Sequence, residues 1–221
     1  MMPGRAAARP DERRRDAWRG LYPITRESGG DPERWLHNIE AALRGGARLL
    51  QYRDKREDAP RRFTEARALL GIAERHGAAL IINDDLELAL AVGAHGVHVG
   101  RDDVSLAAAR ERLGPAAIIG VSCYAQLDCA RQAERAGADY VAFGSFFPSP
   151  TKPLAARAGV DLLRAWRTHA TPVCAIGGIT LENAPELTGA GADLLAVISA
   201  LWDAADIERT ARAFSGLLDP G

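Results

Sequence analysis

The chain has little lysine and little cysteine. Of its 28 lysine and arginine residues only two are lysines, Lys55 and Lys152, so arginine carries nearly all of the positive charge. The three cysteines, Cys123, Cys129 and Cys174, form no CxxC pair and have no histidine-rich cluster beside them. This pattern argues against a zinc site and against a disulfide framework. We therefore predict free thiols and a cytoplasmic location, where thiols stay reduced.

Long apolar runs and an excess of either charge are also missing. No stretch approaches the uninterrupted apolar length of a transmembrane helix, and a net charge of −1 argues against a nucleic-acid surface built on bulk positive charge. We expect neither a membrane nor a nucleic acid as partner. Residues 1–18 are rich in Arg and Ala and lack the apolar core of a secretory signal. We predict a disordered tail over 1–18 and one catalytic domain over 19–221.

Short apolar runs alternate with Ala-, Arg- and Glu-rich segments of helical period from Leu21 onward. Strands are predicted at 21–25, 49–53, 79–83, 96–99, 117–122, 140–143, 173–176 and 194–198, and helices at 31–44, 60–76, 85–91, 105–113, 125–136, 160–168, 181–189 and 205–217. Strands that are apolar on both faces and separated by helices indicate a parallel sheet covered by helices. Eight such units predict a single-domain α/β protein, a (β/α)₈ TIM barrel. A doubly wound open sheet is the alternative, but no Rossmann glycine fingerprint follows the first strand.

Three polar side chains lie at the end of the second predicted strand. Gln51, Arg53 and Lys55 are spaced two apart, which on an extended chain points them to one face. All three donate hydrogen bonds and two are positive, so together they suit a small anion such as a diphosphate. Because arginine serves elsewhere in this chain, Lys55 and Lys152 are candidates for sites that need a compact, mobile ammonium.

Carboxylates follow the third and fourth predicted strands. Asp84 and Asp85 follow Asn83, and Asp102 and Asp103 follow the next strand. Carboxylates from adjacent strand ends suit a hard cation such as Mg²⁺ bridging a diphosphate. Each pair also precedes a helix, so we expect one member to cap that helix and the other to face the barrel mouth; spacing alone leaves open which is which.

The last two strands and one long loop supply further candidates. Gly177-Gly178 and Ser199 follow strands seven and eight, where barrels bind phosphate with exposed backbone amides. The loop 145–153 mixes aromatic, hydroxyl and proline residues before Lys152, and a surface turn is the alternative for it. His98 lies within an apolar strand, so we interpret it as packing inside the barrel rather than as catalytic. Cys123 and Cys174 are expected to be small core residues.

Six short motifs occur in the order seen in one known family. They are Gln-Tyr-Arg-Asp-Lys, Ile-Ile-Asn-Asp-Asp, Gly-Val-His-Val-Gly-x-x-Asp, Pro-Ser-x-Thr-Lys, Ile-Gly-Gly-Ile and Val-Ile-Ser-Ala. In this order they resemble the motifs of thiamine-phosphate synthase, also called thiamine-phosphate pyrophosphorylase. The resemblance runs from about Leu21 to Trp202, nearly all of the predicted domain.

The resemblance implies a role for each matching residue. It assigns the pyrimidine diphosphate to Gln51, Arg53, Lys55, Asn83, Ser122 and Lys152, Mg²⁺ to Asp84 and Asp103, and the thiazole phosphate to Ser149, Thr151, Gly178, Ile198 and Ser199. Tyr52, Asp54 and Pro150 lie within the same motifs and are counted with the substrate-binding set. Arg53, Lys55, Ser122 and Lys152 are the expected catalytic residues.

The family's reaction joins a hydroxymethylpyrimidine diphosphate to a thiazole phosphate and releases diphosphate. Diphosphate leaves first, giving a pyrimidine-methyl cation that the thiazole nitrogen then attacks. This needs charge neutralisation on the leaving group and little proton transfer, which fits a site rich in Arg, Lys and Mg²⁺. Two alternatives remain: a thiazole tautomerase-like paralogue, and a barrel that binds a phosphate metabolite without catalysis. The oligomeric state stays open, a homo-oligomer included.

Overall fold

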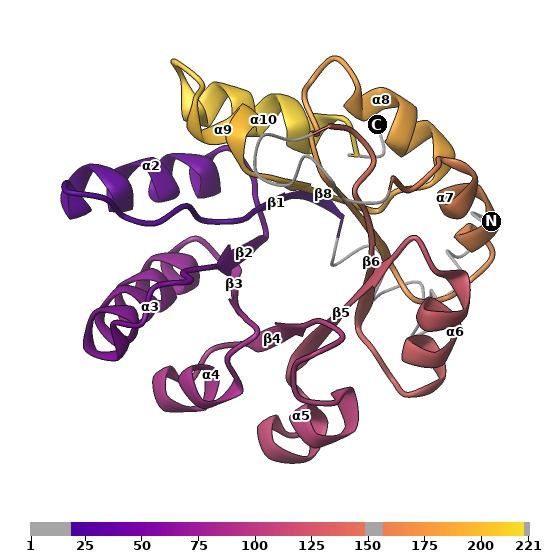
Figure 1. The fold of residues 1–221 in the computed structure, drawn as a ribbon. Helices are drawn as coiled ribbons and strands as arrows, with labels where there is room; N and C mark the ends of the chain where they lie inside the picture. Colours follow the sequence, from indigo (N-terminus) through magenta and orange to yellow (C-terminus); the bar gives the residue numbers. More distant parts are fainter. Residues whose placement is uncertain (1–18, 149–156, 219–221) are drawn as a thin grey trace, which may run out of the picture.

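Eight parallel strands form the centre of the molecule, and helices surround them (Figure 1). The computed structural model describes residues 19–148 and 157–218, so the predicted tail over 1–18 lies outside the described residues. The strands are β1 (Gly20–Pro23), β2 (Leu49–Tyr52), β3 (Ala79–Asn83), β4 (Gly96–Val99), β5 (Ile118–Tyr124), β6 (Tyr140–Gly144), β7 (Val173–Ile176) and β8 (Leu194–Val197). They are hydrogen-bonded in the order β1-β8-β7-β6-β5-β4-β3-β2. The predicted barrel is therefore confirmed.

The barrel closes between β1 and β2 through a short junction instead of a ladder. Ile24 and Gln51 form one isolated parallel bridge, and the Thr25 N–H donates to the Gln51 carbonyl at 2.8 Å. Every other pair of neighbouring strands shares a ladder of at least three residue pairs. The β1–β2 junction is thus the thinnest part of the sheet, and Gln51 lies on it.

Helices follow the strands almost as predicted. They are α2 (Pro32–Arg44), α3 (Ala59–Arg75), α4 (Leu86–Val92), α5 (Leu106–Leu113), α6 (Leu127–Arg135), α7 (Asp161–Trp166), α8 (Ala184–Ala190), α9 (Ser199–Trp202) and α10 (Ile207–Gly216). The one-turn helix α9 was not predicted, because a single turn has no periodicity to detect. Its Trp202 indole donates to the Ile24 carbonyl at 2.7 Å, which fixes α9 beside the end of β1.

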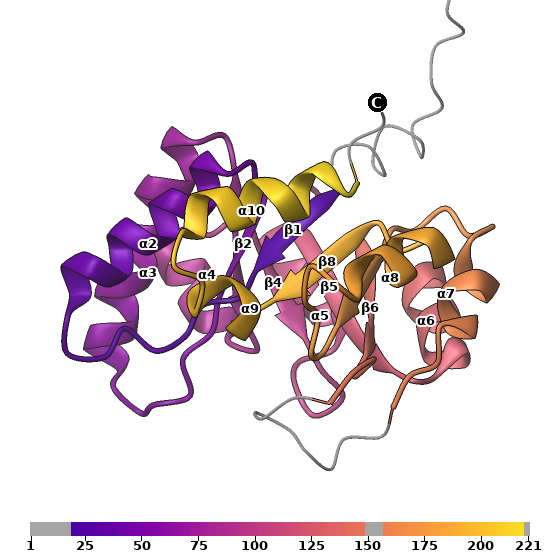
Figure 2. The ribbon, with the colours of Figure 1, turned by 90° about the horizontal axis from the view of Figure 1, so that it is seen from above.

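The first and last described helices lie side by side and complete the outer ring (Figure 2). Arg44 at the end of α2 pairs with Glu208 in α10 at 2.9 Å. Gly45 permits this close packing, since a Cβ there would lie 2.4 Å from the Ala211 Cβ. No helix within residues 19–148 and 157–218 has the length and apolar character needed to span a membrane.

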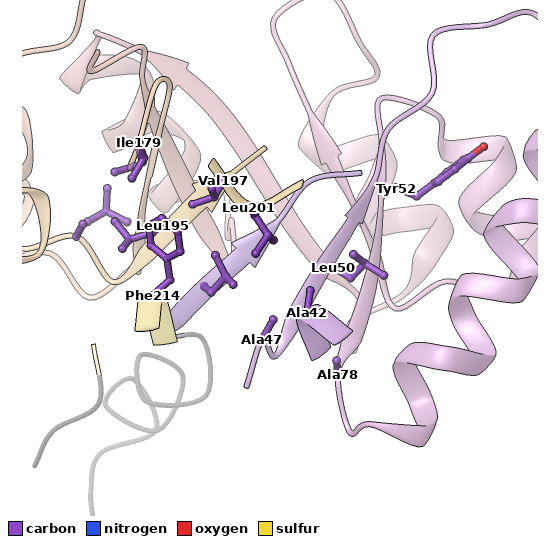
Figure 3. Close-up of a cluster of buried hydrophobic side chains, with 14 of the residues drawn as sticks. Ala42, Ala47, Leu50, Tyr52, Ala78, Ile179, Leu195, Val197, Leu201 and Phe214 are labelled. Atoms are coloured by element: carbon purple, nitrogen blue, oxygen red, sulfur yellow. The ribbon is translucent and has the colours of Figure 1, made fainter. Parts of the chain in front are cut away.

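The apolar core consists of one cluster inside the barrel and two between the strands and the helices. Along β2 the side chains alternate: Leu49 belongs to the inner cluster, whereas Leu50 and Tyr52 belong to the larger outer one, which Figure 3 draws. This alternation turns Gln51 into the barrel. Cys123 and Cys174 are both fully buried, as predicted, and burial raises the pKa of each thiol.

Gly120 in β5 makes room for a tyrosine that crosses the barrel interior. A Cβ at this position would lie 2.0 Å from Cζ of Tyr140. We predict that Gly120→Ala lowers the free energy of unfolding by about 1–3 kcal/mol, the usual cost of overpacking a core. Urea denaturation of both proteins measures this. Gly189→Ala is the matched control, because Gly189 lies in α8 with open space around it and should lose no stability. Equal stabilities of Gly120→Ala and wild type would contradict the prediction.

Candidate active site at the barrel mouth

One lysine and two aspartates meet at the carboxyl ends of β3 and β4. The Lys55 ammonium donates to Asp84 Oδ2 at 2.6 Å. The Asp84 side chain also lies within hydrogen-bonding reach of Asp103, whose Oδ2 accepts the Gly100 N–H at 2.7 Å. Three side chains from three separate loops thus converge, as predicted for residues at the ends of neighbouring parallel strands.

The two carboxylates of this cluster differ in acidity. Burial alone would raise the pKa of Asp84, but hydrogen bonds from Lys55 and Asp103 outweigh it and hold that pKa below its ordinary value. Burial and the neighbouring Asp84 charge raise the pKa of Asp103. The two acids thus share a hydrogen bond, and two carboxyl groups this close suit a cation between them. Asp84 also has a φ of 63°, a left-handed conformation that is uncommon outside glycine and typical of functional sites.

The expected division of the aspartate pairs is confirmed for one pair and wrong for the other. Asp85 caps α4 by accepting the Leu88 N–H at 2.9 Å, which leaves Asp84 to face the mouth. Neither Asp102 nor Asp103 caps α5, because that helix begins at Leu106 and the Ser105 side chain accepts the Ala108 N–H instead. Asp103 turns toward Asp84, and Asp102 is exposed.

The residues of the Gln51–Lys55 stretch alternate between two surroundings. Gln51 points into the barrel, where its Nε2 donates to the Tyr22 hydroxyl at 2.9 Å. The Arg53 guanidinium has no ion-pair partner among the residues that the structure describes, while the Arg53 backbone N–H donates to Thr25 Oγ1 at 2.9 Å. This bond ties the backbone after β2 to the end of β1.

Tyr52 and Asp54 are engaged by other side chains. The Tyr52 hydroxyl donates to Glu65 of α3 at 2.8 Å, and the buried Asp54 carboxylate accepts from the backbone and side chain of Arg56. Asp54 lines the same hollow as Lys55 and Asp84. The substrate-binding role expected for both residues from the motif stays a prediction.

A chain of hydrogen bonds crosses the barrel interior below the mouth. The Tyr22 and Tyr140 hydroxyls are 2.7 Å apart, Tyr140 lies 2.9 Å from His98 Nδ1, and His98 Nε2 lies 2.8 Å from Ser122 Oγ. Burial lowers the pKa of His98 to about 4, so the ring is neutral at physiological pH. The prediction that His98 packs inside the barrel is confirmed. The two tyrosines were missed, since nothing in their apolar strands marks them as partners of residues so distant in sequence.

The opposite rim of the mouth is built from closely packed backbone. Gly177 and Gly178 have φ values of 107° and 63°, and a Cβ on Gly178 would lie 2.4 Å from the Pro148 carbonyl oxygen. The Phe147 N–H donates to the Gly177 carbonyl at 3.0 Å, which fixes the start of the loop after β6 against this turn. Ser199 opens helix α9 directly after β8. Bare backbone therefore lines this rim.

Comparison with known proteins agrees with this geometry. The family model for thiamine monophosphate synthase matches residues 21–201. The chain belongs to that family. It is 57% identical over 199 residues to a thiamine-phosphate synthase of Thiobacillus denitrificans, covering 90% of this chain and 94% of that protein. It is 54% identical over 202 residues to one of Thioalkalivibrio sulfidiphilus, covering 91% and 96%. A solved thiamine phosphate pyrophosphorylase from Pyrococcus furiosus superposes with a TM-score of 0.81 at 34% identity, covering 92% of this chain and 96% of that one.

As a member of the thiamine monophosphate synthase family, this chain is an enzyme. The structure places most of the predicted residues around one mouth. Gln51, Arg53, Lys55, Asn83, Asp84, Asp103, Ser122, Gly178, Ile198 and Ser199 lie at the carboxyl ends of strands or in the turns that follow them. Ser149, Pro150, Thr151 and Lys152 lie outside the described residues, so their placement stays a prediction.

The predicted Mg²⁺ site depends on two side chains, Asp84 and Asp103. Among residues 19–148 and 157–218 no three His, Cys, Asp or Glu side chains gather in one cluster. Asp84 and Asp103 nonetheless suit Mg²⁺, which is bound through one or two carboxylates together with substrate phosphates rather than by a full protein cage. A hollow of about 410 Å³ lies beside them, lined by Lys55, Arg62, Asn83 and Val104 among others. A larger hollow of about 530 Å³ lies at the opposite end of the barrel and holds none of the predicted site residues.

Proposed function

We propose that the protein condenses 4-amino-2-methyl-5-(diphosphooxymethyl)pyrimidine with a thiazole phosphate to form thiamine phosphate and diphosphate. One observation carries the proposal: Lys55, Asp84 and Asp103 meet at the mouth of a barrel of this family. This combination serves a reaction in which a diphosphate departs. The relatives in Thiobacillus denitrificans and Thioalkalivibrio sulfidiphilus carry the name of that activity.

Asp84 and Asp103 would hold Mg²⁺ in this proposal. When bound, the ion supplies positive charge to the diphosphate oxygens and stabilises them as they leave. The depressed pKa of Asp84 keeps a carboxylate ready for a cation at neutral pH. Lys55 and Arg53 add two further positive charges on the same rim. Lys152, the second lysine, is proposed to act on the same leaving group.

The bond that breaks in the proposed reaction joins the pyrimidine methylene carbon to the diphosphate oxygen. Its electron pair leaves with the diphosphate, and the amino group of the ring stabilises the resulting cation. The thiazole nitrogen then donates its lone pair to the methylene carbon. Arg53, Lys55 and Ser122 neutralise the leaving group through donated hydrogen bonds. These reaction steps need no strong general base. His98, which lies below the mouth, is neutral and buried.

The thiazole phosphate is proposed to bind on the opposite rim. Gly178, Ile198 and Ser199 present backbone and one hydroxyl there, and Ser149, Pro150 and Thr151 are predicted to complete the site. Such a division places the anion of each substrate at its own rim, with the reacting atoms between them.

The location in the cytoplasm also stays a proposal, supported by three free cysteines. A homo-oligomer stays a prediction.

A reconstituted reaction tests the proposed function. We predict diphosphate release and thiamine phosphate formation only when the pyrimidine diphosphate, the thiazole phosphate and Mg²⁺ are all present, measured by coupled phosphate assay and mass spectrometry. Removing Mg²⁺ with EDTA should abolish the signal, because the two carboxylates would then face the diphosphate without a cation. Diphosphate release without the thiazole would contradict the proposal. Isomerisation of a thiazole alone would instead favour the tautomerase alternative, and binding without turnover the binding-barrel alternative.

A further inference from the structure

Four hydrogen bonds link five side chains in a line from the β1–β2 junction to the mouth. The line runs from Gln51 through Tyr22, Tyr140 and His98 to Ser122, with donor–acceptor distances of 2.9, 2.7, 2.9 and 2.8 Å. The first four side chains are at most 8% exposed, so water cannot replace any of these bonds. Each polar hydrogen on this line therefore needs the partner that the structure gives it.

The direction of the line is set at its start. The Gln51 amide presents its nitrogen to Tyr22, and an amide nitrogen only donates. The Tyr22 oxygen thus accepts from Gln51. The 2.7 Å distance between the two tyrosine hydroxyls fits a hydrogen bond in either direction, and the Tyr22 hydrogen has one remaining partner, the Tyr140 oxygen. A reversed direction would leave the Tyr22 hydrogen buried without an acceptor, which costs more than a normal hydrogen bond gains.

The same accounting continues to the mouth. The Tyr140 oxygen is taken by Tyr22, so its hydrogen goes to His98 Nδ1. A neutral imidazole that accepts at Nδ1 carries its hydrogen on Nε2, and this hydrogen goes to Ser122 Oγ. The hydroxyl hydrogen of Ser122 is then free to point into the mouth.

We propose that this relay makes His98 a positioning residue, which holds Ser122 as a hydrogen-bond donor toward the departing diphosphate. The assignment of diphosphate as acceptor rests on the proposed function. With the opposite histidine tautomer, Ser122 would donate to His98 and turn only lone pairs toward an anion. The direction of the relay thus decides whether Ser122 attracts or repels the leaving group.

The tautomer of His98 is measurable without substrate. In protein labelled with ¹⁵N-histidine, long-range ¹H–¹⁵N spectra distinguish a ring with hydrogen on Nε2 from one with hydrogen on Nδ1. We expect the Nε2–H form at neutral pH, assigned by the loss of its signals in His98→Gln. A ring protonated on Nδ1 would overturn the relay. The spectrum is that of the wild-type protein, so the result needs no active variant, and a folded His98→Gln or His98→Asn protein serves only to assign the signals.

Kinetics tests the link between His98 and Ser122. In His98→Asn the amide oxygen replaces Nδ1 as acceptor for Tyr140 but nothing donates to Ser122, whereas His98→Gln reaches the Nε2 position with a donor. We expect His98→Asn and Ser122→Ala each to lower kcat/KM for the pyrimidine diphosphate about 10- to 100-fold, the loss of one bond to a charged group, with His98→Gln retaining more activity. His37→Asn, on the exposed surface of α2, is the control.

The double variant separates positioning from a general structural role. If His98 acts through Ser122, His98→Asn combined with Ser122→Ala should be no slower than Ser122→Ala alone. Ser122→Ala already removes the hydroxyl that His98 positions, so losing His98 as well costs nothing more. Fully multiplying losses would overturn the proposal. Absence of diphosphate release by the wild type would overturn diphosphate as the acceptor, and the tautomer measured in the same sample would still decide whether the relay exists.

Discussion

Asp84→Asn should reduce the rate of thiamine phosphate formation about 100- to 1000-fold while the protein stays folded. Asparagine keeps the shape of the side chain and removes its charge, so a cation loses one of two carboxylates and Lys55 loses its partner. Removing one preorganised electrostatic contact at a site of developing charge costs about 10²–10³ in turnover. The measurement is kcat and KM for the pyrimidine diphosphate over a range of Mg²⁺ concentrations, with the variant needing more Mg²⁺ for half-maximal rate.

Asparagine is the right replacement here because of the backbone at Asp84. The residue has a φ of 63°, which asparagine tolerates better than alanine does, so the variant avoids strain unrelated to charge. Asp102→Asn is the matched control, since Asp102 is an exposed aspartate one residue from Asp103 that takes no part in the cluster. A rate for Asp84→Asn within about twofold of the control, at low and high Mg²⁺, would remove Asp84 from the metal site.

Lys55→Met should lower kcat about 100-fold or more, because the departing diphosphate loses one of the positive charges that stabilise it. Lys55→Arg should recover only part of this loss. A planar guanidinium has a fixed fork of donors, whereas the ammonium is compact and mobile enough to leave Asp84 for the diphosphate. Steady-state rates of diphosphate release with both substrates saturating measure the effect.

Stability cannot explain such a loss in the lysine variants. Lys55 is 56% exposed and its pair with Asp84 lies at the surface, where ion pairs contribute about 0–1 kcal/mol. Thermal unfolding of Lys55→Met should therefore match that of Arg212→Met, which removes an ion pair with Glu208 at the opposite end of the barrel. If Lys55→Met and Arg212→Met turn over equally fast, Lys55 has no role in departure of the diphosphate.

The fold was largely predictable because the strands and helices of a barrel are each indicated by a local pattern in the amino-acid sequence. The apolar run around Leu50 and the aspartate–proline start at Asp31 each determine an element through their own neighbours, and both elements form where predicted. The spacing of Gln51, Arg53 and Lys55 likewise predicted which side chains share a face. The same rule turns the Tyr52 side chain to the other face, where it donates to Glu65.

The remaining features depend on contacts between distant parts of the chain. Tyr22 and Tyr140 are 118 residues apart, and no local pattern in either strand announces the other. Whether Asp102, Asp103 or Ser105 caps α5 depends on where the helix begins, and a shift of two or three residues changes the answer. Such a shift lies within the usual uncertainty of a predicted helix boundary. Sequence therefore indicated which chemistry gathers at the mouth, while the support beneath it became visible only in three dimensions.

The barrel is closed at one short junction, where a backbone bridge between Ile24 and Gln51 is joined by hydrogen bonds from Gln51 to Tyr22 and from the Arg53 N–H to Thr25. Gln51 is therefore both part of this junction and the first donor of the line that ends at Ser122. Transient opening of the β1–β2 junction would thus free Gln51 first. The Ser122 hydroxyl would lose its fixed orientation before the rest of the sheet opened. Chemical competence and ring closure are in this way tied to the same residue.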